Sequence, residues 1–235
     1  MPKTALELLN KVGRHLRRSS PKNPYTSLDQ DANAVFVFEM INEAKRMVEA
    51  ERHWHLLRQT LFFNSVPFVT EYDLSDPAVI EAGSNPLNRR SRITADRFRR
   101  PQFWDISDDE FRLRRNTREI VLDRQLFTEN SQRRITEFAM YPSVNGLEIM
   151  FPWDPSESRR YRGEFTVPQA DLELPDDEML IYEDPVIYAA VALASEERGE
   201  ELGVVSATWW ERYDNALSEA IVVDSDPTDY ELFWD

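Results

Sequence analysis

The chain has 235 residues, and 41% of them are hydrophobic, which is enough to bury a core in one large domain or two small ones. A total of 28 lysines and arginines against 43 aspartates and glutamates gives a net charge of −15, which disfavours adhesion to nucleic acid or to anionic membranes. Cysteine is absent, so disulfides, thiolate metal sites and a cysteine nucleophile are excluded.

Two amphipathic helices are predicted within the first 54 residues. Thr4 and Glu7 form a capping box directly before a run of apolar residues at helical spacing. Asp29 or Asp31 is expected to cap a longer helix, in which apolar residues keep a 3.6-residue period to about Arg52.

Between residues 55 and 170 the hydrophobic period shortens toward two, which is typical of half-buried strands. The strands predicted from this alternation are 111–114, 118–123, 135–141, 147–151 and 161–167. Asn145 and Gly146 predict a type I′ hairpin, and the flanking Pro142 and Pro152 indicate edge strands. Several short antiparallel strands favour a small sandwich or barrel.

Two further helices are predicted toward the C-terminus. Asp184 is placed as an N-cap with Pro185 at the first helical position. Ser206 is expected to cap the last helix, which has Trp209 on its apolar side and continues to Val223.

The predicted fold class is α+β. The N-terminal and C-terminal helix pairs, residues 1–54 plus 171–223, are expected to pack together as a four-helix bundle, although the two pairs are far apart in the sequence. A central antiparallel β sandwich or barrel occupies residues 55–170, and an extended C-terminal arm occupies residues 224–235. Residues 171–235 hold nineteen acids and two arginines, so the negative charge is concentrated at this end of the chain.

The arm is the first candidate binding site, because it carries large apolar groups among acids. These groups are Tyr230, Leu232, Phe233 and Trp234. Aromatic side chains are frequent hot spots of protein interfaces. Two alternatives are a fold-back of the arm onto its own bundle and a calcium loop at residues 224–231. The second conflicts with Pro227 and with the lack of a glycine at the sharp turn.

An arginine group interleaved with aromatic residues is the second candidate surface, and it includes Arg99, Arg100, Arg112 and Arg114. Alternation along a strand places Arg112 and Arg114 on one exposed side. Three interpretations remain open: a solvated face balanced by nearby acids, salt bridges between subunits, and contact with DNA.

Enzymatic function finds little support. His53 and His55 could offer two metal ligands, but no third ligand stands at a defined spacing. There is neither a G-x-S-x-G motif nor a phosphate-binding glycine-rich loop. We therefore expect no catalytic residue, no cofactor and no metal. The chain also has no leader pattern and no apolar run long enough to cross a membrane, which favours a cytoplasmic setting.

Several segments follow one another in an order that resembles a known family. They are Thr4–Asn10, Ser27–Asp29, Trp54 after an amphipathic helix, Tyr72–Leu74, Tyr141–Pro142, Leu147–Pro152, Tyr161–Phe165 and Leu174–Pro175. In order and spacing they look like the tail tubular protein A family of phage head-to-tail adaptors, and the resemblance covers nearly the whole chain.

This resemblance implies a structural virion protein in the head-tail neck, assembled in the host bacterial cytoplasm. Such adaptors form a ring, commonly a dodecamer, that docks under the portal protein and conducts double-stranded DNA to the tail. The helical bundle and the arm would engage the portal, and the β part would contact the downstream tail protein, a nozzle or tail-completion component.

The charge agrees with a conduit, because DNA carries about one negative charge per 1.7 Å of duplex and an acidic wall lets it slide. Copies near −15 also repel one another, so the ring would need a template. The alternative function is a soluble acidic interaction module or nucleic-acid mimic, which would act as a monomer or dimer.

Overall fold

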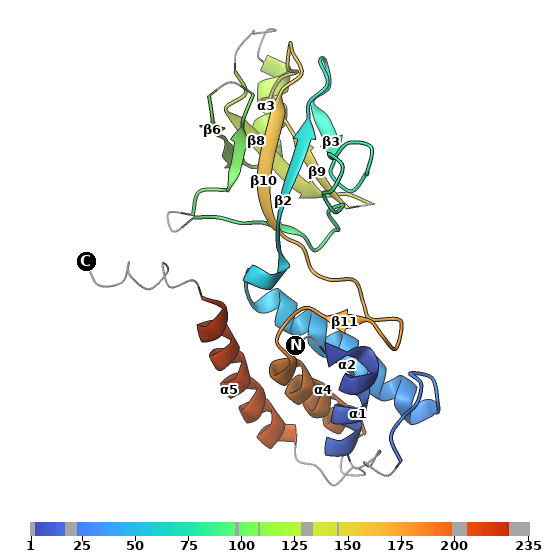
Figure 1. Cartoon of the computed structure of the whole chain (residues 1–235). Helices are drawn as coiled ribbons and strands as arrows, with labels where there is room; N and C mark the ends of the chain where they lie inside the picture. Colours follow the sequence, from blue (N-terminus) through green and yellow to red (C-terminus); the bar gives the residue numbers. More distant parts are fainter. Residues whose placement is uncertain are drawn as a thin grey trace, which may run out of the picture. The chain divides into compact units, whose positions relative to one another are not determined.

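The computed structural model describes residues 3–16, 23–96, 99–107, 109–127, 134–144, 146–198 and 206–225. Within this part the chain is mixed α+β, with five α-helices and mostly antiparallel sheets (Figure 1). It divides into a helical unit, residues 1–57 with 169–235, and a β unit, residues 58–168. Each bound of the β unit lies two or three residues from the bound expected above.

The helical unit contains α1 (Ala5–His15), α2 (Ala32–Glu51), the short 3-10 helix η1 (His55–Leu57), α4 (Glu183–Arg198) and α5 (Ser206–Asp224). The predicted capping box is confirmed, since Thr4 Oγ1 accepts the Glu7 N–H and Glu7 Oε2 accepts the Thr4 N–H, each at 3.3 Å. Asp31 caps α2 through the N–H of Ala34 at 2.7 Å. Such caps are worth about 1 kcal/mol each.

Helix α4 holds the unit together because it packs against α1, α2 and α5. Alanines at positions 189, 190, 192 and 194 are fully buried, and such small side chains let neighbouring helices approach closely. Helix α4 begins at Glu183, two residues before Pro185, so the predicted N-cap at Asp184 is wrong.

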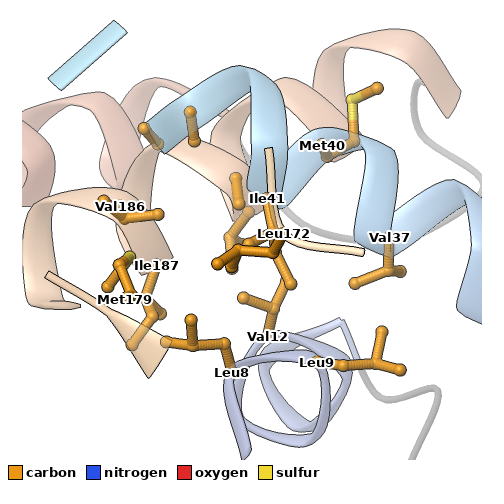
Figure 2. Close-up of a cluster of buried hydrophobic side chains, with 14 of the residues drawn as sticks. Leu8, Leu9, Val12, Val37, Met40, Ile41, Leu172, Met179, Val186 and Ile187 are labelled. Atoms are coloured by element: carbon orange, nitrogen blue, oxygen red, sulfur yellow. The ribbon is translucent and has the colours of Figure 1, made fainter. Parts of the chain in front are cut away.

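A single hydrophobic cluster joins these helices. Figure 2 shows its centre, where side chains of α1, α2 and α4 converge with Leu172 and Met179. A two-stranded sheet, β1 (Lys3–Thr4) with β11 (Glu178–Met179), ties the start of α1 to the segment before α4.

The first sheet of the β unit comprises β2 (Arg58–Asn64), β4 (Arg92–Ile93), β5 (Phe103–Asp105), β6 (Phe111–Arg112) and β10 (Arg160–Thr166). Strand β10 pairs antiparallel with β2 over its whole length, with Arg58 opposite Thr166. The chain therefore enters and leaves the β unit through adjacent strands.

The second sheet has the order β3 (Glu71–Asp73), β9 (Leu147–Met150), β8 (Glu137–Pro142) and β7 (Arg114–Asn116). Strands β7 and β8 are parallel, although only antiparallel strands were expected. The chain changes sheets at Leu113, whose N–H bonds to Phe103 in the first sheet, while the N–H of Arg114 bonds to Thr136 before β8. One hydrophobic cluster contains buried residues of both sheets.

The strand predicted at residues 118–123 is wrong, because Arg118–Phe127 forms helix α3. Val121 is fully buried against Ala139 and Met150, so its burial fixes one side of the helix against the second sheet.

The hairpin between β8 and β9 exists, but not in the predicted form. Pro142 pairs with Leu147, so residues 143–146 connect the strands, and Gly146 lacks the positive φ that a type I′ turn requires there. Asn145 lies outside the described residues. A Cβ at position 146 would lie 2.3 Å from Ser75 Cβ, so close approach explains the glycine. Both strands are interior, and the predicted edge strands are therefore wrong.

Candidate interaction surfaces

The four apolar arm residues Tyr230, Leu232, Phe233 and Trp234 lie outside the described residues, which end at Ser225. The structure describes the last turn of α5, which directly precedes this segment in the sequence. The Asp224 carboxylate accepts the His55 N–H at 3.1 Å on each oxygen and lies 3.7 Å from Arg52 Nε. Arg52 in turn donates to the Ile221 carbonyl and to Ser225 Oγ, at 3.0 and 3.2 Å.

These contacts correct the boundary predicted for the arm. Asp224 is the last residue of α5 and only 5% exposed, because its charge is compensated by Arg52 and by a backbone N–H. Helix α5 therefore includes Asp224, and the Ser225 N–H bonds to the Ile221 carbonyl of its last turn. The predicted arm overlaps the helix at Asp224, and its residues 226–235 lie outside the described residues.

Alternation along a strand predicted that Arg112 and Arg114 share one exposed side, and this prediction is wrong. Its guanidinium donates to Asp96 at 2.6 Å and to the carbonyls of Arg100 and Pro101 at 2.9 and 2.8 Å. Arg114 lies beyond the change of sheets, on the edge strand β7, and is exposed. The structure thus gives Arg112 a structural task and leaves Arg114 on the surface.

On the outer side of the first sheet, arginine side chains stack on aromatic rings and form ion pairs with nearby acidic residues. Arg112 and Arg162 lie opposite Trp104 on the two neighbouring strands, 5.4 and 4.4 Å from its ring centroid. Arg162 pairs with Glu110 at 2.6 Å. Acidic residues of the same unit therefore neutralise these arginines, which disfavours a DNA-binding face here.

A further internal pair lies on the same sheet. Arg160 donates through two nitrogens to the two oxygens of Glu81, each at 2.8 Å. These hydrogen bonds from Arg160 lower the pKa of Glu81, although its partial burial acts in the opposite direction.

Arg99 and Arg100 lie in a tight turn that Arg112 holds in place. Arg99 has a φ of 59°, a conformation uncommon for residues other than glycine, and its N–H bonds to the Asp96 carbonyl at 2.8 Å. Both arginine side chains are exposed. Of the predicted interface group, Arg99, Arg100 and Arg114 are therefore on the surface and Arg112 supports the turn.

The net charge is divided unequally between the units. The helical unit contains 26 acidic and 11 basic residues, and the β unit contains 17 of each. The whole excess of −15 therefore belongs to the helical unit.

Sequence reasoning missed an apolar loop between β2 and β3. Val66, Phe68 and Val69 are 55%, 80% and 37% exposed, and we call these three residues the apolar tip. The available signal was the uncharged run Asn64–Thr70 in a chain with 30% charged residues.

The structure also shows a hollow of about 390 Å³ beside α1. The charged residues in its wall are Lys3, Lys11, Arg14, Glu7, Asp176 and Glu183. Three basic groups among three acidic groups give the hollow no net charge with which to select an ion.

The described residues contain no group of three or more side chains suited to hold a metal ion, and His53 and His55 acquire no third ligand among them. No helix in the described part of the chain is both long and apolar enough to cross a membrane.

Comparison with protein families finds no family model that matches this chain. Comparison with curated proteins likewise finds no significant match.

Proposed function

We propose that this protein is a head-to-tail adaptor of a tailed phage, a structural virion protein and not an enzyme. In this proposal α1, α2, α4 and α5 form a four-helix bundle, and the two sheets of the β unit form a sandwich. Copies assemble as a ring, commonly of twelve, below the portal protein and pass DNA toward a downstream tail protein.

The observation that carries the proposal is the anchored end of α5. Asp224 and Arg52 fix the last turn of the helix, so the chain directly before the proposed arm has a defined place in the helical unit. Residues 226–235 of the arm combine four large apolar side chains with four acids. Burying one such apolar side chain is worth roughly 1.5 to 3 kcal/mol, before the cost of ordering the segment.

The division of charge supports the same function. The helical unit is acidic and therefore repels DNA, so DNA can pass along it without binding. The β unit has no net charge and can contact other proteins without strong repulsion. Repulsion between helical units also explains why a portal ring would act as the template for assembly.

The experiment is cosedimentation of the chain with tailless capsids that carry the portal of the same phage, with electron microscopy of the pellets. The full chain is compared with a version that ends at Ser225. A cut after Val223 is unsuitable because it also removes the buried Asp224. We expect a ring at the portal vertex with the full chain and none with the shortened chain; no binding by either would overturn the proposal.

A matched pair of variants separates the apolar contribution from the acidic one. In one variant Tyr230, Leu232, Phe233 and Trp234 are replaced by serine. In the other, Asp226, Asp229 and Glu231 are replaced by the corresponding amides. We expect the first variant to lose binding and the second to keep it, because buried apolar groups supply most of the energy of such interfaces.

The excess of acid on the helical unit also favours a second candidate, an acidic module that imitates nucleic acid and binds a basic protein. A mimic acts as a monomer or dimer, loses binding as salt is added, and adds no ring to the capsid. The same pellets therefore distinguish the two functions.

A further inference from the structure

The apolar tip is hydrogen-bonded to other parts of its own chain. The Tyr72 hydroxyl accepts the Val66 N–H at 3.0 Å and donates to the Val69 carbonyl at 2.7 Å. The Phe68 N–H bonds to the Pro155 carbonyl at 3.2 Å. Tyr72 is itself buried, so its hydrogen bonds join Val66 and Val69 to the core of the β unit, while Phe68 is joined to Pro155.

Phe68 is an unfavourable residue for its position in two ways. Its φ of 66° is a left-handed conformation that glycine adopts at less cost, and its side chain is 80% exposed. The Phe68 ring contributes little to the stability of the folded chain, because most of its surface remains exposed to solvent. Strained residues of this kind are concentrated at functional sites, which makes the exposed ring a candidate contact.

The tip lies at one end of the β unit, away from the points where the chain enters and leaves it. Strand β2 runs seven residues from Arg58 to the tip, a rise of roughly 20 Å. Leu126, which is 77% exposed, belongs to the same end, because the Gln125 side chain bonds to the Phe151 carbonyl and the Phe151 N–H bonds to Thr70.

We propose that the apolar tip is a self-association surface through which two copies of this chain meet tip to tip about a two-fold axis. An apolar patch is complementary to itself, as a two-fold contact requires. The residues Asn64–Thr70 contain no charge, and the β unit has no net charge. A contact through the helical units would instead bring together two surfaces that share the whole excess of −15.

The size of the tip predicts the strength of the pair. Its three side chains expose roughly 200 to 300 Å² per copy, which is well below the roughly 800 Å² per partner of a standard interface. The pair is therefore weak and reversible, and it forms at high protein concentration. It requires no ring and no portal, so it stands apart from the proposed function.

The first test is sedimentation velocity over a concentration series with the full chain, Phe68→Gly and Val144→Ser. Val144 is 86% exposed in the connection between β8 and β9 and serves as the control, because it lies at the opposite end of the second sheet. We expect Phe68→Gly to need at least tenfold more protein to associate, whereas Val144→Ser behaves like the parent. Equal association by all three proteins, or none by the parent at any concentration, would overturn the proposal.

The melting temperature shows whether the Phe68→Gly variant is folded. Glycine accepts the positive φ, so we expect a melting temperature at or above that of the parent. Added sodium chloride should strengthen the pair, because salt screens the repulsion between acidic copies and does not weaken an apolar contact. Weaker association at high salt would mean that ion pairs hold the copies together, which contradicts the proposal.

The second test uses the absence of cysteine from the chain. Val66→Cys and Val144→Cys each introduce a single exposed thiol. A tip-to-tip contact brings two copies of the first thiol together, so under mild oxidation Val66→Cys should form disulfide dimers at least tenfold faster. Equal rates would overturn the proposal, and so would rates for Val66→Cys that do not fall when Phe68→Gly is added.

Discussion

Lys45 and Glu49 form a buried ion pair on α2, with Lys45 Nζ 3.1 Å from Glu49 Oε1 and both side chains at most 1% exposed. The pair also holds the segment that returns from the β unit. Lys45 Nζ donates to the carbonyls of Gln169 and Ala170 at 2.8 and 2.9 Å, and Glu49 accepts the Gln169 N–H at 3.1 Å. One side of α2 thereby satisfies the backbone of a segment far away in the sequence.

Replacement of Lys45 should be strongly destabilising. We expect Lys45→Met to lower the free energy of unfolding by about 3 to 5 kcal/mol, because it leaves the buried Glu49 carboxylate without its cation. Urea unfolding followed by circular dichroism measures this loss. The control is Lys11→Met: Lys11 is partly exposed and pairs with Glu183 and Asp184, so its loss should cost about 1 kcal/mol or less. Similar losses in both variants would show that the Lys45 pair does not hold the segment.

Asp224 should matter for stability although it lies near the C-terminus. Asp224→Ala removes both acceptors of the His55 N–H and leaves Arg52 without its carboxylate, so we expect a loss of about 1 to 3 kcal/mol. Asp214→Ala is the control, because Asp214 is exposed on the same helix. Comparison of melting temperatures checks the prediction, and an Asp224 variant as stable as the control would restore the arm boundary expected from the sequence.

Local signals predicted the helices well. Thr4 with Glu7 and Asp31 start α1 and α2 as expected, because a cap and a helical period depend on residues a few positions apart. Ser206 is already a helical residue of α5, so its predicted role as a cap stays a prediction. The strand prediction failed at residues 118–123, where alternation over six residues could not be distinguished from a short helix. The deciding contact, Val121 against the second sheet, is not local.

The candidate surfaces were predicted less well for the same reason. Asp224 looked like part of a solvated acidic arm, and only its contact with His55, 169 residues earlier, shows that it is buried. Arg112 looked exposed because the change of sheets at Leu113 breaks the alternation. The exposed position of Phe68 depends on the hydrogen bonds of the Tyr72 hydroxyl with Val66 and Val69, which composition alone does not reveal.

His15 should make stability depend on pH. Burial, followed by the nearby positive charges of Arg212, Lys11 and Arg14, lowers the pKa of His15 below its ordinary 6.5. Its ring packs against Trp209, with centroids 5.0 Å apart. Because the unfolded chain binds the proton more readily, this contribution to stability is complete above pH 6.5 and decreases as the pH falls toward the lower native pKa.

The measurement is the free energy of unfolding by urea between pH 7.5 and 5.5, for the parent and for His15→Gln. We expect the parent to lose stability over this interval and the variant to lose less, because glutamine does not titrate. The three acids whose pKa values are lowered, Glu81, Glu119 and Asp177, ionise below pH 4.5 and so do not contribute to a change within this interval. Parallel curves for the two proteins would rule out His15 as the source.

Two tryptophans of the helical unit should differ in their effect on stability. Trp54 is fully buried and donates from Nε1 to the Val48 carbonyl at 2.7 Å, so Trp54→Ala should cost about 3 to 5 kcal/mol. Trp209 is half-buried and packs on His15 and Tyr188, so Trp209→Ala should cost less, about 1 to 2 kcal/mol. Urea midpoints at unchanged slope provide the comparison. An equal or larger loss at Trp209 would mean that the assembled helical unit buries that side chain more fully, and the packing of α5 on α4 would have to be revised.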